Sequence, residues 1–280
     1  MKCRYVREQR TICGRDMKTA PFLEVDLFEI SGREHRASRR AKQKMATKLA
    51  QKKYNEKISI RHFVQIVKTN FTRDAWVLTY TYNSEHLPAP GDEKRVDADW
   101  TNYIKRLRRR VQGPIKWVAV PEHSVIDPDT GEVTGRHHHH VILEGAVTYE
   151  DLMAAWCDRD GEKIGFVYVE KMDLKHSSAE ALARYMVKRR RHARKWRQSR
   201  GLQKPKTPQP NDTRYSRREL DRAATLYVDD RDYWEKKYPG FTPTSIEPMM
   251  TGAGSWHIVA KLERVPAAQK RRRTNAKNQP

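Results

Sequence analysis

The central part of the sequence alternates between strand-like and helix-like segments, and this alternation strongly limits the folds open to the chain. Residues 75–82, AWVLTYTY, are rich in β-branched and aromatic residues, which favour a strand. Three later runs have the same character: IKWVAV (115–120), HHHHVILE (137–144) and GFVYVEKM (165–172). Apolar residues at helical spacing predict a helix near 97–111 and another after Thr148. Ser177 and Glu180 form a capping box that predicts a third helix.

The resulting element order is β-α-β-β-α-β-α, which is close to the split ferredoxin-like unit. The turn-forming run DPDTGEVTG separates the second and third strands and predicts a hairpin. We therefore expect an α+β fold with a largely antiparallel central sheet and helices on one face.

Composition divides the rest of the chain into further regions. FLEVDLFEI alternates like a strand, and Ser59 is a good N-cap for a helix bearing Ile60, Phe63 and Val67 on one face. The expected regions are an N-terminal basic arm with helices (1–70), the α+β core (71–200), a linker (201–213), a small C-terminal region (214–262) and a disordered basic tail (263–280).

Charge points to the class of partner. The chain has 57 Lys and Arg against 35 Asp and Glu, a net charge of +22. A cationic surface gains free energy by releasing counterions from nucleic acid, so we expect a polyanion partner. Basic runs that only keep the protein in solution are the alternative. No apolar run approaches the length of a membrane span, and we expect no membrane partner.

The three cysteines are scattered, as expected for reduced thiols in a cytoplasm. The first residues, MKCRYVREQR, lack the apolar segment of a secretion signal. These features predict a cytoplasmic protein.

Four consecutive histidines open the third strand, in GRHHHHVILEG. Alternate side chains of a strand share a face, so His137 and His139 lie with Val141 and Leu143, and His138 lies with His140 on the other face. The first set holds the better core residues and is expected to face the helices. His138 and His140 would then be free to chelate one divalent ion.

Two alternatives to this pairing stay open. A slip of one residue would make His137 and His139 the pair. The run could also be solvated and bind nothing. A third metal ligand is expected from Glu122, which ends the preceding strand, with His123 as the competing candidate.

The third expected helix carries a second group of interest. Tyr185 and Lys188 are spaced i and i+3 and lie on one part of its surface, beside an apolar stripe. This places the Tyr185 hydroxyl at the border of the core, where it could face a cleft. An edge-of-core tyrosine with a solvated lysine is the alternative.

Three segments together resemble a known family. WVLTYTYN (76–83), GRHHHHVIL (135–143) and ARYMVK (183–188) are similar to the three motifs of the HUH endonuclease superfamily, in particular of rolling-circle replication initiators of bacterial plasmids and small single-stranded DNA phages. KWRQSRGLQKP (195–205) resembles a segment of a bacterial and phage branch. The resemblance covers roughly residues 34–205. It departs from the pattern at His139, where a bulky apolar residue is usual.

The resemblance implies a ferredoxin-like or RRM-like HUH core and a set of roles. His138, His140 and Glu122 would hold Mg²⁺ or Mn²⁺, Tyr185 would be the nucleophile, and Lys188 would neutralise the phosphate. The third motif has one tyrosine, which implies a single-tyrosine mechanism. The implied product is a 5′-phosphotyrosine with a free 3′-OH, made from single-stranded origin DNA, and the strand is later rejoined.

The implied partners are origin DNA, a host helicase and a DNA polymerase, because the sequence has no G-x-x-x-x-G-K-[ST] loop. Trp196, Trp117 and Tyr80 are candidates for stacking on bases, with a core role favoured for the last two. A single-tyrosine transposase or relaxase is the related alternative, and a non-catalytic basic nucleic-acid-binding protein is the alternative of another class. The expected DNA-backbone contacts are Lys105, Arg106, Arg109, Arg189, Arg190, Arg194, Lys195 and Arg197.

Overall fold

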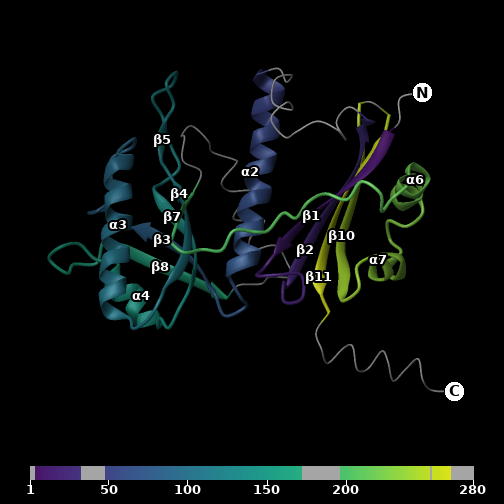
Figure 1. Ribbon diagram of the computed structural model, residues 1–280. Coiled ribbons are helices and arrows are strands. Elements are labelled where there is room, and N and C mark those ends of the chain that lie inside the picture. Colours follow the sequence, from purple (N-terminus) through teal and green to yellow (C-terminus); the bar gives the residue numbers. More distant parts are fainter. Residues whose placement is uncertain (1–3, 33–47, 172–195, 253, 266–280) are drawn as a thin grey trace. The chain divides into compact units, whose positions relative to one another are not determined.

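The computed structural model describes residues 4–32, 48–171, 196–252 and 254–265 (Figure 1). The chain divides into two compact units. Residues 54–202 form one unit, here called the central unit. The other, here called the terminal unit, combines residues 1–53 with residues 203–280.

The central unit is built on a five-stranded sheet in which every neighbouring pair is antiparallel. The strand order is β8-β3-β7-β4-β9. The strands are β3 (Trp76–Tyr82), β4 (Lys116–Glu122), β7 (His138–Glu144), β8 (Gly165–Lys171) and β9 (Arg197–Gln198). A hairpin of β5 (Val125–Ile126) and β6 (Val133–Thr134) connects β4 to β7.

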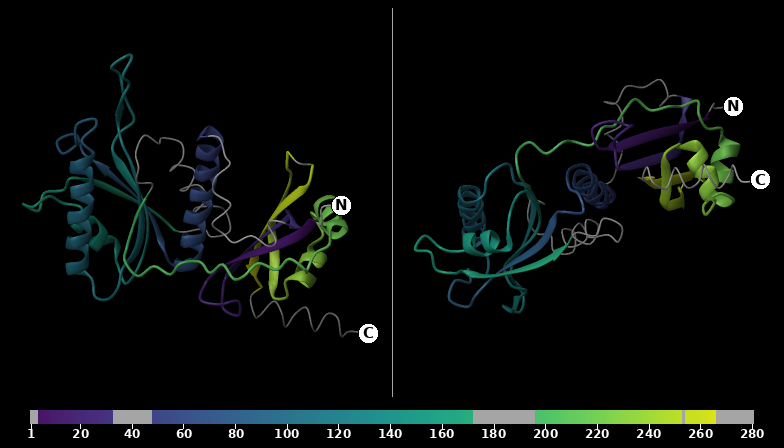
Figure 2. Two further views of the ribbon diagram at one scale, coloured as in Figure 1. Left: turned by 45° about the horizontal axis from the view of Figure 1, so that its top comes forward. Right: turned by 90° about the horizontal axis from the view of Figure 1, so that it is seen from below.

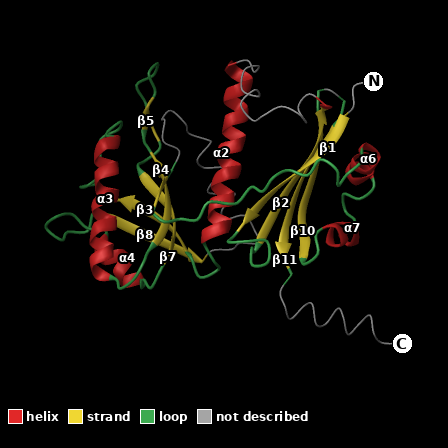
Figure 3. Cartoon of the chain, viewed as in Figure 1, coloured by secondary structure: helices red, strands yellow, loops and turns green. Residues whose placement is uncertain are grey.

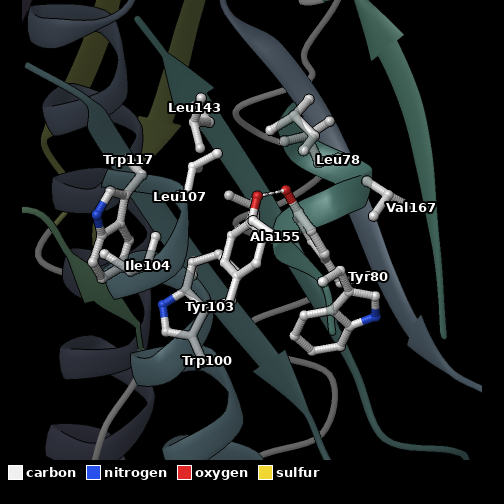
Figure 4. Close-up of a cluster of buried hydrophobic side chains, with 14 of the residues drawn as sticks. Leu78, Tyr80, Trp100, Tyr103, Ile104, Leu107, Trp117, Leu143, Ala155 and Val167 are labelled. Carbon is white, nitrogen blue, oxygen red and sulfur yellow. Dashed lines mark hydrogen bonds between the residues drawn. The ribbon is translucent and has the colours of Figure 1, made fainter. Parts of the chain in front are cut away.

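One face of this sheet packs against α3 (Glu93–Arg110) and α4 (Tyr149–Ala155). Four large aromatic side chains fill the space between helices and sheet: Tyr80, Trp100, Tyr103 and Trp156, each at most 1% exposed (Figure 4). The hydroxyl groups of Tyr80 and Tyr103 are hydrogen-bonded to each other. The predicted capping box at Thr148 is present and starts α4. We call this the helix-covered face.

The opposite face is partly covered by α2 (Lys48–Asn70), whose Phe63 and Val67 pack on Val118 and Ile142 of the sheet. Figures 1 and 2 show α2 and α3 on opposite sides of the sheet. The predicted α+β fold with an antiparallel sheet is confirmed, and α2 adds a layer that we did not expect. The reason is that strands with apolar residues on both faces must be covered on both.

The prediction for the start of α2 was wrong. Ser59 was expected to be its N-cap, but it is a buried residue inside a helix that begins at Lys48. The preceding run of Lys, Leu, Ala and Gln consists of good helix formers, which extend the helix upstream of Ser59.

The terminal unit joins strands from both ends of the chain in one antiparallel sheet, ordered β1-β2-β11-β10. Helices α6 and α7 pack on one face of it (Figure 3). The elements are β1 (Arg4–Cys13), β2 (Phe22–Ser31), α6 (Arg217–Thr225), α7 (Arg231–Lys237), β10 (Phe241–Met250) and β11 (Trp256–Arg264).

This sheet differs from the separate N-terminal arm and C-terminal region expected from the sequence. The strand FLEVDLFEI was anticipated, whereas β1, α7 and β10 were not. Pro243 and Pro248 argue against a strand, but β10 lies at the sheet edge, where proline is tolerated. The expected linker lacks helix as predicted, but Lys206 and Asn211 form bridges to β1.

Two other expectations fall on residues that the structure does not describe. The Ser177–Glu180 capping box and nearly all of the tail after residue 263 lie there. None of the helices in the described part of the chain combines the length and hydropathy needed to cross a membrane.

Candidate metal centre

The pairing of β4 with β7 brings the expected metal ligands together. Glu122 is directly opposite His138, and Val120 is opposite His140. Directly opposite residues of an antiparallel pair point to the same face. Glu122, His138 and His140 therefore lie at one end of the sheet, on the face opposite α3 and α4.

Three side-chain atoms converge there. His138 Nε2 lies 2.8 Å from Glu122 Oε2, and His140 Nε2 lies 3.4 Å from the same oxygen. The two Nε2 atoms are 2.9 Å apart. Among the described residues, these three form the one group of His, Cys, Asp or Glu side chains placed to hold a metal ion. His123, the competing ligand, lies outside it, with its ring edge-on to His137.

The second nitrogen of each imidazole is held by a neighbour. His138 Nδ1 is 2.7 Å from the Arg136 carbonyl oxygen, which can only accept a hydrogen bond, so Nδ1 carries a proton. In a neutral His138, Nε2 then presents its lone pair to Glu122. His140 Nδ1 is 3.3 Å from Thr79 Oγ1 on β3. Such outer contacts fix the orientation of metal-binding histidines.

The donor set fits a divalent ion. Two imidazole nitrogens and a carboxylate oxygen suit first-row divalent metals, and carboxylate is also a ligand for Mg²⁺ and Mn²⁺. Lone pairs that converge this closely repel one another unless a cation or a proton lies between them. The sequence analysis did not identify Thr79 or the Arg136 carbonyl, because their roles depend on pairing across strands and on a backbone atom.

The other two histidines are buried and have different surroundings. His139 is 1% exposed and lies between the rings of Trp100, Tyr82 and Trp156. Its two ring nitrogens have no hydrogen-bond partner among the described residues. Burial lowers the pKa of His139 well below its usual value, so the ring is neutral.

His137 is fully buried and acts as a hydrogen-bonding link. Its Nδ1 accepts from the backbone N–H of Ser124 at 3.3 Å, so its Nε2 carries the proton. That Nε2 donates to the Ala89 carbonyl at 3.0 Å. His137 therefore ties the loop after β4 to the segment before α3.

The expected DNA-binding cations fall into two groups. Lys105 and Arg109 are exposed on α3. Arg106 instead binds the carbonyl oxygens of Ala155 and Cys157 at the end of α4. Arg197 binds Asp97 and Thr101 of α3. These two arginines hold helices in place, because the carbonyl groups at a helix end need donors.

Two aromatic candidates for base stacking are core residues, as favoured from the sequence. Tyr80 is fully buried and Trp117 is 8% exposed. Trp196 is half-buried, with its ring 5.4 Å from that of Phe63 on α2. The remaining site residues lie outside the described part of the chain: Tyr185, Lys188, Arg189, Arg190, Arg194 and Lys195.

Comparison with known proteins gives one match. Residues 75–190 match the model of a family described as replication-associated protein ORF2. The matched segment includes the three converging side chains and the position of Tyr185. No curated protein and no solved structure matches the chain. The family match is consistent with a replication initiator.

Proposed function

We propose that this protein starts rolling-circle replication by nicking single-stranded origin DNA through a tyrosine nucleophile. The observation that carries the proposal is the convergence of Glu122, His138 and His140 within a segment that matches a replication-associated family. The net charge of +22 supports a nucleic-acid substrate.

In the proposed reaction, the Tyr185 oxygen attacks the phosphorus of the scissile phosphodiester. The bond between phosphorus and the 3′ oxygen breaks as the new bond forms. The tyrosine hydroxyl gives up its proton, and the leaving 3′ oxygen gains one. The products are a 5′-phosphotyrosine and a free 3′-OH that can prime synthesis. Because the phosphotyrosine keeps the energy of the ester bond, a later 3′-OH can rejoin the strand without ATP.

The side chains of this chain have distinct tasks in that reaction. Glu122, His138 and His140 would hold Mg²⁺ or Mn²⁺, which supplies charge neutralisation at the phosphoryl oxygens when bound. Arg136 and Thr79 position two of these ligands through the contacts to Nδ1. Lys188 would neutralise the phosphate or the phosphotyrosine. A host helicase and DNA polymerase would supply unwinding and synthesis in the bacterial cytoplasm.

The test is formation of a covalent adduct. The protein is incubated with a labelled single-stranded origin oligonucleotide and Mn²⁺, and the products are separated on a denaturing gel. We expect a protein–DNA adduct that is lost in Tyr185→Phe and kept in the matched control Tyr149→Phe, whose tyrosine is exposed on α4.

Two results would contradict the proposal. An equal adduct in Tyr185→Phe would exclude this tyrosine as the nucleophile. Tight DNA binding with no adduct at all would identify a non-catalytic nucleic-acid-binding protein instead.

A further inference from the structure

Strand β8, at one edge of the central sheet, exposes two aromatic side chains on one face. Phe166 is 58% exposed and Tyr168 is 62% exposed. The residue between them, Val167, is 5% exposed and belongs to the core beneath α3 and α4. Phe166 and Tyr168 therefore point away from the helix-covered face.

The strand register places these rings in line with the candidate metal centre. Phe166 is opposite Thr81, which is opposite His138. Tyr168 is likewise opposite Thr79, which is opposite His140. The two aromatic residues thus share a face and an end of the sheet with the metal-binding group. They lie two strands from it, or about 10 Å at the usual strand spacing.

The spacing of the rings suits unpaired bases. Side chains at i and i+2 on a strand are about 6.7 Å apart, so both rings can be presented to consecutive bases of an extended strand. Single-stranded nucleic acid is commonly held by aromatic side chains on an open sheet, because every base has a flat face that can stack. Paired bases inside a duplex do not offer that face.

The charges around the rings also favour a phosphate chain that runs toward the metal centre. Arg136 is exposed, and its guanidinium donates to the Tyr82 carbonyl at the end of β3, next to Thr81. Glu170, two residues beyond Tyr168 on the same face, carries a negative charge. Phosphates are therefore attracted toward the end of the sheet that holds Phe166 and His138, and away from the Glu170 end.

We propose that Phe166 and Tyr168 stack on two unpaired bases that flank the scissile phosphate of single-stranded DNA. The proposal rests on the proposed function for the statement that this strand is the one cut. The stacking surface itself predicts DNA binding that requires neither metal nor the tyrosine nucleophile.

The test measures binding without chemistry. Fluorescence anisotropy follows a labelled oligothymidylate as the full chain is added in EDTA. Phe166→Ala and Tyr168→Ala are each expected to weaken binding by about tenfold, the scale measured when a stacking ring is removed. Tyr168→Phe should bind like the parent, because stacking needs the ring and not the hydroxyl. The matched control Tyr149→Ala, an exposed aromatic residue on α4, should also leave affinity unchanged.

A second arm separates stacking from a general loss of structure. Affinity for a duplex of the same length should be equal in the parent, Phe166→Ala and Tyr168→Ala. In Phe166→Trp, the added tryptophan fluorescence should be quenched when oligothymidylate binds.

The proposal is overturned if both alanine variants bind oligothymidylate as tightly as the parent, which would leave these rings to a protein partner. It is equally overturned if duplex affinity falls in parallel. The adduct assay on Tyr185→Phe is independent of these measurements. A failure of the nicking proposal would therefore leave the stacking result intact, and the reverse also holds.

Discussion

The two faces of strand β7 use the same residue type for opposite purposes. His138 and His140 lie on the face with Glu122, and their Nε2 atoms converge on its carboxylate. His139, between them in sequence, lies on the helix-covered face inside a cage of aromatic rings. All three are histidines of one strand, yet two are placed to bind a cation and one is neutral and packed like an apolar residue.

The difference shows that position on the sheet, and not residue type, decides the chemistry here. On one face the imidazole nitrogens meet a carboxylate, a carbonyl and a hydroxyl. On the other they meet aromatic carbon atoms, and burial favours the uncharged ring. Substitutions on one face should therefore leave the chemistry or the packing of the other largely unchanged.

The largest expected effect comes from the metal-binding face. His138→Ala and His140→Ala should each slow adduct formation by more than about 100-fold, because loss of a ligand exceeds the usual cost of losing a supporting contact. His137→Ala should still nick, although loss of its link to Ala89 will lower stability. Initial rates of adduct formation measure the effect. Full activity in His138→Ala with loss in His137→Ala would show that the pairs are assigned to the wrong faces.

The helix-covered face should respond through stability. Trp156 is fully buried, contacts the rings of Tyr80 and Tyr103, and donates to the Thr81 carbonyl. Trp156→Ala should lower the free energy of unfolding by about 3–5 kcal/mol, measured by urea denaturation. Tyr149→Ala, on the exposed side of α4, should change it by less than about 0.5 kcal/mol. Similar losses in both would argue against the core described for this unit.

Replacing His139 should separate the two faces most sharply. The ring nitrogens of His139 lack hydrogen-bond partners among the described residues, and an unsatisfied buried polar group costs about 1–3 kcal/mol. His139→Leu is therefore expected to raise the free energy of unfolding by about 1 kcal/mol and to leave nicking unchanged. A large loss of stability would mean that the ring has a polar partner. Parallel calorimetry and adduct assays give the two readings.

The smallest effect at neutral pH concerns the buried tyrosine pair. Burial raises the pKa of Tyr80 and Tyr103 above the usual value of about 10. Above that pH the unfolded chain loses these protons while the folded chain keeps them, so stability falls as pH rises. The double variant Tyr80→Phe/Tyr103→Phe should lose less stability between neutral and strongly alkaline pH than the parent. An identical alkaline loss in both proteins would exclude this pair as its source.

Local sequence patterns were enough to predict much of the candidate site. The two-residue period of a strand separates His138 and His140 from His139 once Val141 and Leu143 mark the core. The hairpin between β4 and β7 places Glu122 beside them because the connection is short. Both arguments use residues close together in sequence, where pattern and geometry are directly linked.

Features that depend on distant pairing were not predictable in this way. Strand β2 pairs with β11 across more than half of the chain, and nothing local in either strand names its partner. Arg106 and Arg197 look like surface cations in the sequence, but each meets carbonyl or carboxylate groups that only the fold brings near. Similarly, Phe166 looks like a core residue until the register shows which face it occupies.

The pairing of β2 with β11 also sets an order of events during synthesis. Residues 54–202 are complete well before residues 256–264 leave the ribosome, so the central unit can fold first. Until then, β1 and β2 can form a hairpin, but the other edge of β2 has no partner strand from its own sheet. The nascent protein therefore passes through a stage in which its candidate metal centre can assemble while its terminal sheet is still half built.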